Sequence, residues 1–367
     1  HDLILTPEDY KLENGDLVIK TSKITPYPTH FDVTDFFTID ERKNLVAHSV
    51  GSIVVPEGQF SVENGVITIK STYLKDNPEF YSQNGENIII SNRYFYVHED
   101  GVVQPQSATV ILDYRTGHIK AIVGGRDVDG TRILNRATDS QRQPGSAIKP
   151  IAVYWPALNN GQTAATAIDD TPFYNGAGEL WPKNWYNSYR GLHTLRRSVE
   201  QSVNVNSVKM LQKIGITASV EHLKKIGIID VDHPERDSFV TSTENRQVND
   251  ENLSSLGLGG MTKGLTPLEI TAAYGAIANK GIYVEPIAFT KILDKNGNLL
   301  IDNTPKETMA SSPQVAYLMG DIMRTTVANG IAGRARMNNM VVAGKTGTTQ
   351  NQADIWFIGY TPYYVSG

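Results

Sequence analysis

The segment Ala108–Gly125, ATVILDYRTGHIKAIVGG, marks the point at which the pattern of the chain changes. It predicts a strand, a turn at Thr116–Gly117 and a second strand, and helical spacing of apolar residues dominates the sequence that follows. Strand patterns return near the end of the chain, in VVAGKTGTT (Val341–Thr349) and ADIWFIGYT (Ala353–Thr361). A sheet that one hairpin opens and distant strands complete, with helices between them, predicts a mixed α/β (α+β) domain.

The intervening sequence predicts the helices of this domain. Apolar residues recur at helical spacing in Ala147–Asn159, Leu195–Ile214, Pro267–Asn279 and Ser312–Asn329. A further hairpin is predicted over TKILDKNGNLLI (Thr290–Ile301), which contains an Asn-Gly turn signal.

The sequence before Gln106 predicts a smaller all-β domain. Short strand patterns follow Asn14–Gly15, Asn64–Gly65 and Asn84–Gly85, and Asn-Gly between such runs is a strong hairpin signal. LENGDLVIK and VENGVITIK, which begin at Leu12 and Val62, resemble each other, through duplication or, as we favour, through shared turn chemistry. We therefore predict a β-rich domain over residues 1–106 and the α/β domain over residues 107–367.

Composition excludes several classes of protein. The chain of 367 residues is 40% hydrophobic and 20% charged, as in ordinary globular proteins. Its net charge of -5 and the lack of a basic run argue against a nucleic-acid partner. The absence of cysteine excludes disulfides, thiolate metal sites and cysteine catalysis, and the histidines lack ligand spacing, so we predict no metal and no cofactor.

Membrane association is expected only through a segment that this chain does not contain. No apolar run approaches the roughly 18 residues of a membrane span. The sequence starts at His1 and is interpreted as a processed or excised piece, whose anchor or targeting segment lies outside it.

The stretch RQPGSAIKP (Arg142–Pro150) places Ser146 and Lys149 one helical turn apart. Pro150 lacks an N–H and fits only the first turn of a helix, so the pair is expected at a helix N-terminus. There the Lys149 amine can reach the Ser146 hydroxyl, and the unpaired N–H groups can stabilise an oxyanion. A base needs a lysine pKa lowered from about 10.4 towards neutrality, which burial and a second cation can provide. Ser-x-x-Lys alone also fits a solvated first turn.

Two further clusters join this pair. QSVNVN contains Ser202-Val203-Asn204, and GKTGTT contains Lys345-Thr346-Gly347-Thr348 on a predicted strand. Together and in this order the three clusters resemble the motifs of the penicilloyl-serine transferases, the penicillin-binding proteins and serine β-lactamases. The sequence around these clusters, which includes SLGLGG and TPLEITAAYGAIANKG, resembles the transpeptidase domain of class A penicillin-binding proteins. This resemblance extends from Ser107 to the end of the chain.

The resemblance implies a mainly antiparallel sheet flanked by helices, preceded by a linker domain of possible OB-like form. It also implies that Ser146 attacks the penultimate D-alanine of a peptidoglycan stem peptide and forms an acyl-enzyme, which a neighbouring stem amine resolves into a crosslink. A β-lactam would acylate Ser146 as a false substrate. Lys149 would be the base, Ser202 would relay a proton to the leaving D-alanine, and Asn204 would orient Lys149 and hold the acyl-chain amide.

On the facing strand, the resemblance implies that Lys345 supplies positive potential. The hydroxyls of Thr346 and Thr348 would bind the terminal carboxylate, and Gly347 would keep the cleft open. The backbone N–H groups of Ser146 and Thr348 would form the oxyanion hole.

The resemblance also implies departures and alternatives. A membrane helix and a glycosyltransferase domain precede this domain in the family, so glycan polymerisation is not expected of this chain. The final strand and the C-terminal helix that follow GYTP in the family are expected to be missing. The implied location is the extracytoplasmic face of the bacterial membrane, with stem peptides, β-lactams and other cell-wall synthesis proteins as partners.

Three functions stay open at this point. The first is a serine D-Ala-D-Ala transpeptidase, with carboxypeptidase activity when water replaces the amine. The second is a β-lactamase or β-lactam sensor, for which the only Glu-x-x-x-Asn match, Glu200–Asn204, overlaps the second motif, and none of the 17 tyrosines begins Tyr-x-Asn. The third is a non-catalytic cell-wall scaffold.

Overall fold

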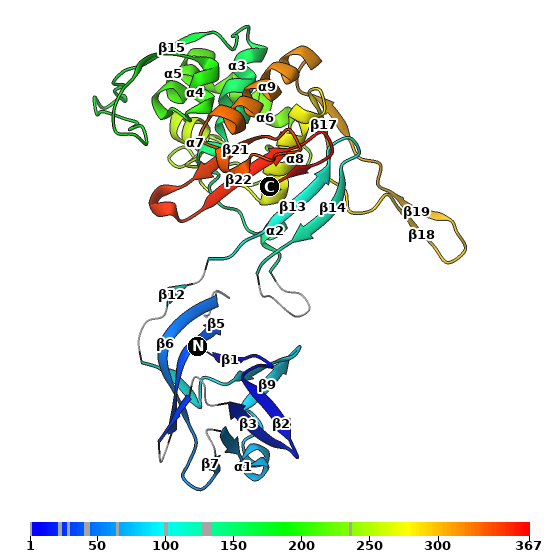
Figure 1. Ribbon diagram of the computed structural model, residues 1–367. Helices are drawn as coiled ribbons and strands as arrows, with labels where there is room; N and C mark the ends of the chain where they lie inside the picture. The colour runs from blue at the N-terminus through cyan, green and yellow to red at the C-terminus, as the bar shows by residue number, and fades with distance from the viewer. Residues whose placement is uncertain are drawn as a thin grey trace. The chain divides into compact units, whose positions relative to one another are not determined.

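Two compact units make up the computed structural model of this chain (Figure 1). It describes residues 2–20, 24–27, 30–39, 45–63, 66–98, 102–103, 105–126, 134–234 and 237–367. The N-terminal unit comprises His1–Ser107 with Gly125–Ile133, and the C-terminal unit comprises Ala108–Gly124 with Leu134–Gly367.

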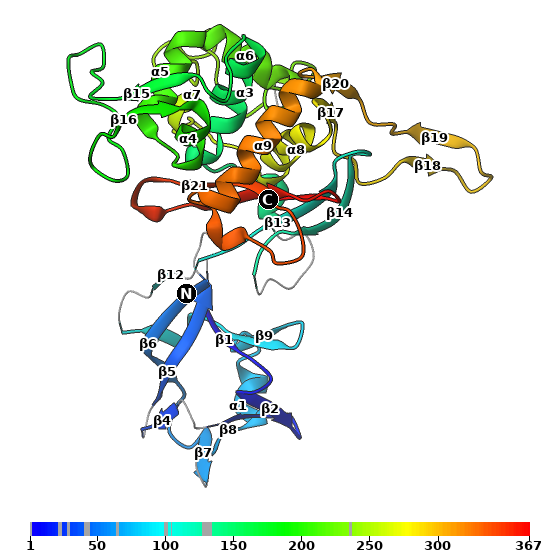
Figure 2. The same ribbon diagram turned by 45° about the horizontal axis from the view of Figure 1, so that its top comes forward.

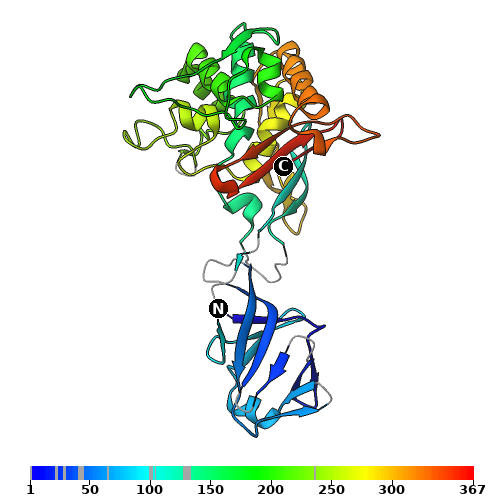
Figure 3. The ribbon, with the colours of Figure 1, turned by 60° about the vertical axis from the view of Figure 1, so that its left-hand side comes forward.

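In the described part of the N-terminal unit, the strands form two antiparallel sheets (Figure 3). The larger sheet has the order β11-β6-β5-β1-β10-β9, with β12 on β6 and β4 on β5. Its strands are β1 (Asp2–Leu5), β4 (Ile24–Pro26), β5 (His30–Ile39), β6 (Leu45–Val54), β9 (Tyr81–Asn84), β10 (Asn87–Ile90), β11 (Phe95–Val97) and β12 (Val102–Val103). The smaller sheet, β2-β3-β8-β7, contains β2 (Tyr10–Glu13), β3 (Asp16–Lys20), β7 (Phe60–Glu63) and β8 (Val66–Ile69), and α1 (Ser71–Asp76) follows it.

The two similar hairpins of the sequence, β2–β3 and β7–β8, share the smaller sheet, where β3 pairs with β8. The predicted turn at Asn64–Gly65 lies outside the described residues. Alternation along β3 and β8 buries Leu17, Ile19, Ile67 and Ile69 completely. An OB-like barrel is not what the described strands form: an OB fold is a five-stranded Greek-key barrel, whereas these strands form sheets of eight and four strands that combine hairpins with long-range pairs such as β1 with β10.

The C-terminal unit is built on a five-stranded antiparallel sheet with the order β14-β13-β23-β22-β21. Helix α8 packs against β13, β22 and β23, and helix α9 packs against β21. The mixed α/β fold predicted from the sequence is therefore confirmed. The sheet consists of β13 (Thr109–Asp113), β14 (His118–Val123), β21 (Ala343–Thr348), β22 (Ile355–Tyr360) and β23 (Val365–Ser366).

Two long α-helices of this unit start at side-chain caps. Thr266 and Glu269 form a capping box ahead of α8, and Pro267 occupies its first turn. The Ser312 side chain caps α9, where it accepts a hydrogen bond from the Val315 N–H. The helices are α2 (Arg136–Asp139), α3 (Trp155–Asn159), α4 (Leu195–Glu200), α5 (Asn204–Ile214), α6 (Ile216–Lys225), α7 (Leu253–Leu258), α8 (Pro267–Ala278) and α9 (Pro313–Asn329).

Three small hairpins lie outside the main sheet. The pair β18–β19, predicted from its Asn-Gly turn, extends away from the helices of the C-terminal unit (Figure 2). The strands of these hairpins are β15 (Ala167–Asp170) with β16 (Gly191–Thr194), β17 (Ile282–Val284) with β20 (Glu307–Met309), and β18 (Lys291–Leu293) with β19 (Leu299–Asp302).

Two predicted helices are wrong in detail. The segment Leu195–Ile214 is broken into α4 and α5, because Ser202 between them has a left-handed backbone with φ of 51° that no helix continues. The segment Ala147–Asn159 is not one α-helix either. A 3-10 turn at Gly145–Ala147 leads through Lys149 into a π-helical turn at Pro150–Tyr154, and only then into α3. Pro150 sits where its missing N–H costs no hydrogen bond.

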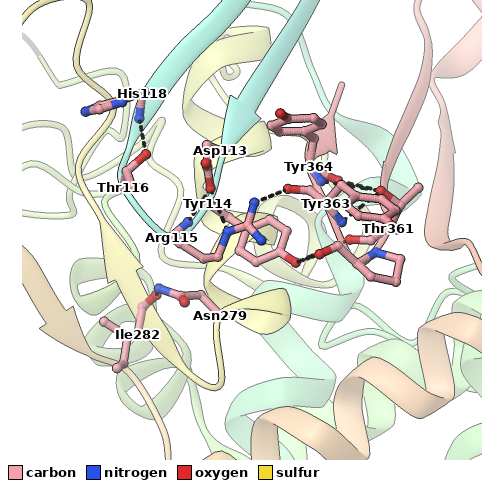
Figure 4. Close-up of polar contacts among 11 residues, drawn as sticks. Asp113, Tyr114, Arg115, Thr116, His118, Asn279, Ile282, Thr361, Tyr363 and Tyr364 are labelled. Atoms are coloured by element: carbon pink, nitrogen blue, oxygen red, sulfur yellow. Dashed lines mark hydrogen bonds and ion pairs between the residues drawn. The ribbon is translucent and has the colours of Figure 1, made fainter.

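The final strand, which we expected to be missing, is present as β23, a strand of two residues between β13 and β22. Hydrogen bonds connect the turn that precedes β23 to the β13–β14 hairpin (Figure 4). Tyr114 Oη donates to the Pro362 carbonyl at 2.8 Å, and Arg115 donates to the Tyr363 carbonyl at 2.7 Å. These contacts bring β23 into register with both neighbours, so β22 has a partner on each side.

Candidate active site

Ser146 lies in the 3-10 turn, and hydrogen bonds from α8 and β22 hold the backbone of this turn. Tyr274 of α8 donates to the Ala147 carbonyl at 2.5 Å, and Trp356 of β22 donates to the Gln143 carbonyl at 2.9 Å. The Ser146 side chain is half-buried and makes no hydrogen bond within the described part of the chain. The backbone around this hydroxyl is thus fixed while the hydroxyl itself faces the pocket described below.

Lys149 is completely buried beside this turn. Its Nζ donates to Asn204 Oδ1 at 2.6 Å and to the Ser202 carbonyl at 3.0 Å. Burial lowers the pKa of Lys149 well below its ordinary value, and the nearby Lys345 lowers it further. The amine therefore has the low pKa that a base requires, although within the described residues no hydrogen bond joins it to the Ser146 hydroxyl.

Ser202 bridges the two lysines. Lys345 Nζ donates to Ser202 Oγ at 2.9 Å, and Lys149 Nζ approaches the same oxygen at 3.4 Å. Lys345 is also completely buried, and burial lowers its pKa to about 7. The left-handed backbone of Ser202, at the break between α4 and α5, is a strained conformation for a residue with a side chain.

The strand β21 supplies another wall of the site. A pocket of about 460 Å³ is lined by Ser146, Trp185, Ser202, Asn204, Ile331, Thr346 and Thr348. Five of the eight residues predicted for the site therefore line one cavity, and Lys149 and Lys345 lie buried behind it.

Gly347 allows β21 to approach the turn that carries Ser146. A Cβ on Gly347 would lie 2.2 Å from the Pro144 carbonyl oxygen and 3.0 Å from the Ala147 side chain. The predicted reason for glycine was an open cleft, whereas the structure shows that a side chain would push the strand away from the Ser146 turn. Gly145 is equally close to Thr348, whose carbonyl oxygen would lie 2.5 Å from an added Cβ.

Residues outside the three sequence motifs also shape the pocket. Trp185 and Ile331 line it, and Trp185 Nε1 donates to the Gln201 carbonyl at 2.8 Å. Asn184 Oδ1 accepts from the backbone N–H of Asn204 at 3.1 Å. The cluster WPKNWYNSY, from Trp181, was the available signal, since aromatic and amide residues of this kind in a loop often line a binding site.

Two polar residues that follow the second motif, Asn206 and Ser207, lie outside the pocket. Asn206 donates to Ser198 Oγ at 2.9 Å, and Ser207 donates to the Gly257 carbonyl at 2.7 Å. Both are completely buried in the packing of α5. Their side chains support the helix and do not line the pocket.

Comparison with known families agrees with this architecture. The family model of the penicillin binding protein transpeptidase domain matches residues 107–365. The chain belongs to this family. Among curated relatives, penicillin-binding protein 1A of Clostridium perfringens strain 13 is 37% identical over 337 residues, which cover 89% of this chain and 46% of the relative.

Solved structures share the fold. The D,D-transpeptidase domain of a peptidoglycan glycosyltransferase from Eggerthella lenta matches with a TM-score of 0.61 and 18% identity, over 91% of this chain and 89% of that one. Penicillin-binding protein A from M. tuberculosis, solved as an imipenem acyl-enzyme complex, matches with a TM-score of 0.62 and 21% identity, over 72% of this chain and 67% of that one.

The chain spans less than half the length of the first curated relatives, 35% of one and 46% of another. Within the described residues, no helix has the length and apolar character needed to cross a membrane.

Proposed function

We propose that this chain is a serine D-Ala-D-Ala transpeptidase that crosslinks peptidoglycan stem peptides through an acyl-enzyme on Ser146. The observation that carries the proposal is the pair of fully buried lysines, Lys149 and Lys345, joined through Ser202 behind a pocket that Ser146 lines. Neither lysine has a carboxylate among its hydrogen-bond partners in the described residues. Such cations are costly to bury, and activation of a nucleophile accounts for them.

In the first step, neutral Lys149 takes the proton of Ser146 as Oγ bonds to the carbonyl carbon of the penultimate D-alanine. The tetrahedral intermediate then collapses, the C–N bond breaks, and the terminal D-alanine leaves with a proton relayed through Ser202. Contact between the Gly145 and Thr348 backbones supports an oxyanion hole formed by the N–H groups of Ser146 and Thr348.

In the second step, the amine of a neighbouring stem peptide attacks the ester carbon. Lys149 takes a proton from the attacking amine and passes it to Ser146 Oγ as the ester bond breaks, which restores the serine hydroxyl and leaves an amide crosslink. Water in place of the amine gives carboxypeptidase activity. A β-lactam follows the first step only: its leaving nitrogen stays tethered to the acyl group, so the adduct persists. The imipenem acyl-enzyme of the M. tuberculosis relative in fold supports this reading.

Recognition of the substrate falls to Asn204 and the β21 strand in this proposal. Thr346 and Thr348 line the pocket and offer hydroxyls to the terminal carboxylate, while Lys345 behind them contributes positive potential. Asn204 orients Lys149, to which it is bonded at 2.6 Å, and also faces the acyl-chain amide.

We also propose that residues 1–106 form the linker domain and residues 107–367 the transpeptidase domain of a longer cell-wall enzyme. The two compact units support this division, although residues 125–133 are grouped with the N-terminal unit. The class A relatives support a location on the extracytoplasmic face of the bacterial membrane, with an anchor outside this chain and other cell-wall synthesis proteins as partners.

Intact-protein mass spectrometry after incubation with penicillin G tests the proposal. We expect a mass increase of one whole penicillin molecule on the native chain, because the ring-opened acyl group keeps every atom. Ser146→Ala should remain folded and show no adduct, since a small hydroxyl in a turn is not a core group. Labelling of the alanine variant would refute the nucleophile, rapid penicillin hydrolysis without an adduct would indicate a β-lactamase, and neither reaction would indicate a scaffold.

A further inference from the structure

A buried carboxylate lies beside the site and has no place in the chemistry proposed above. Asp170, the last residue of β15, is completely shielded from solvent. Its Oδ2 accepts hydrogen bonds from Tyr186 Oη at 2.5 Å and from the Arg190 N–H at 2.9 Å. Its Oδ1 accepts from Asn184 Nδ2 at 2.7 Å. Burying an ionised carboxylate is costly, so the bonds that it organises need a reason.

The amide of Asn184 connects this carboxylate to the catalytic cluster. Asn184 Nδ2 donates to Asp170 and, at 3.1 Å, to the Ser188 carbonyl. Asn184 Oδ1 accepts from the backbone N–H groups of Asn204 at 3.1 Å and Val205 at 3.2 Å. A flipped amide would set its oxygen against two acceptors and its NH₂ against two donors. The donors and acceptors around the Asn184 amide therefore fix its orientation.

Asn184 thereby caps the start of α5, where the first backbone N–H groups have no partner within the helix. Val203, which precedes α5, makes no side-chain capping bond, so Asn184 supplies an acceptor from a distant loop. Asn204 is the first residue of this helix, and its Oδ1 accepts from Lys149 Nζ at 2.6 Å. The position of the Lys149 amine thus depends on where the Asn184 amide holds the helix end.

We infer that Asp170 is a positioning residue for the acyl transfer: through the Asn184 amide it fixes Asn204 and hence aligns Lys149 with Ser146. The inference rests on the proposed function for its catalytic consequence. Asp170 and Asn184 do not line the pocket, so they act through Asn204 and not on the substrate.

The donor and acceptor pattern makes the inference testable with variants that keep shape. In Asp170→Asn, an amide oxygen placed towards Arg190 and Tyr186 sets the new NH₂ against the NH₂ of Asn184. The opposite rotamer sets that NH₂ against the Arg190 N–H. In Asn184→Asp, two carboxylates face each other across the 2.7 Å contact. Each single variant therefore loses at least one bond in any orientation.

The double variant Asp170→Asn/Asn184→Asp exchanges the two groups. The new amide at position 170 would donate to the new carboxylate at position 184 and keep its oxygen towards Tyr186 and Arg190. That carboxylate would still cap the backbone N–H groups of Asn204 and Val205. Only the bond to the Ser188 carbonyl is lost.

Glu179→Gln is the matched control for the single variants. It makes the same change of carboxylate to amide at an exposed position of the same loop. There Glu179 bonds only Asn175 through its side chain in the described residues.

The experiment measures stopped-flow acylation by a chromogenic cephalosporin, resolved into the acylation rate constant and the dissociation constant of the initial complex. A misalignment of about 1 Å can slow a reaction roughly a hundredfold. We expect each single variant to lose about that factor in the rate constant, with the dissociation constant changed less than about threefold. The double variant should recover to within about tenfold of the native rate, and Glu179→Gln should match the native chain.

Amide hydrogen exchange at Asn204 and Val205, followed by NMR on the same variants, is independent of activity. Faster exchange in the single variants and recovery in the double variant are expected. Native acylation rates in Asp170→Asn, or a double variant no faster than the single ones, would overturn the inference. A native chain that is never acylated would instead refute the proposed function, and unchanged amide exchange would then also refute the positioning of Asn204.

Discussion

The apolar core of the N-terminal unit and the lysine pair behind Ser146 are both shielded from water, but they consist of chemically opposite side chains. In the core, the side chains of Leu17, Ile19 and Ile67 are completely buried among other apolar groups. Behind Ser146, the buried side chains are those of Lys149 and Lys345, with a serine between them. Burial stabilises the first region and costs free energy in the second.

The difference shows what each region is for. A β-sheet core gains stability with each apolar group that is removed from water. Its apolar side chains carry no titratable group, so their burial shifts no pKa. The lysines lose solvation, and that loss lowers their pKa values. In the proposed mechanism, this lowered pKa favours the neutral amine of Lys149 that acts as a base on Ser146, so the unfavourable burial of the lysine serves the reaction.

The largest effect is expected at Lys149. Lys149→Ala should slow acylation by penicillin about 10² to 10⁴-fold, because an unassisted serine hydroxyl is a poor nucleophile at neutral pH. The rate of adduct formation by mass spectrometry measures this effect. A rate within about tenfold of the native one would remove Lys149 from the role of base.

Paired substitutions in the two regions should act in opposite directions on stability. Ile67→Ala, in the apolar core, should lower the free energy of unfolding of the N-terminal unit by about 2 to 5 kcal/mol. Lys345→Met should raise that of the C-terminal unit, because it replaces a buried amine that has no carboxylate partner in the described residues by an apolar side chain, while acylation falls. Urea unfolding of each variant measures both, and a destabilised Lys345→Met would show that the two regions do not differ in the way described.

A smaller effect is expected at Thr348, which lines the pocket and has no hydrogen bond to either buried lysine within the described residues. Losing a charge-assisted hydrogen bond commonly costs about 1.5 to 3 kcal/mol, so Thr348→Val should lower second-order acylation by penicillin about 10 to 150-fold. An uncharged ester analogue should be affected far less. Equal losses for acid and ester would mean that Thr348 shapes β21 without reading the carboxylate.

Local signals in the sequence predicted much of the fold. The hairpins at Asn14–Gly15 and Asn84–Gly85 and the start of α8 depend on neighbouring residues, so their chemistry is visible in a short window. The break at Ser202 and the short strand β23 were missed. Both are fixed by partners far along the chain, since Lys345 bonds Ser202 and β23 lies between β13 and β22.

The site divides in the same way. Motif resemblance gave Ser146, Lys149 and the β21 residues, and the structure brings them to one pocket or directly behind it. Asp170 and Asn184 carry no motif of their own. Their proposed role depends on two hydrogen bonds: one joins Asp170 to Asn184, 14 residues later, and one joins Asn184 to the backbone of Asn204, a further 20 residues later. The spacing of residues in the sequence cannot reveal such bonds.

Burial lowers the pKa of both lysines, and NMR titration of ¹³Cε-labelled lysine side chains measures this effect directly. Lys345, assigned by its loss in Lys345→Met, should titrate near pH 7, and Lys149 should titrate well below the other lysines. Because both native pKa values lie below those of the unfolded chain, the unfolded state binds more protons in between, and stability should rise as pH increases from about 7 towards 10. Titration of both lysines near 10.4, as in solvent, would contradict the account.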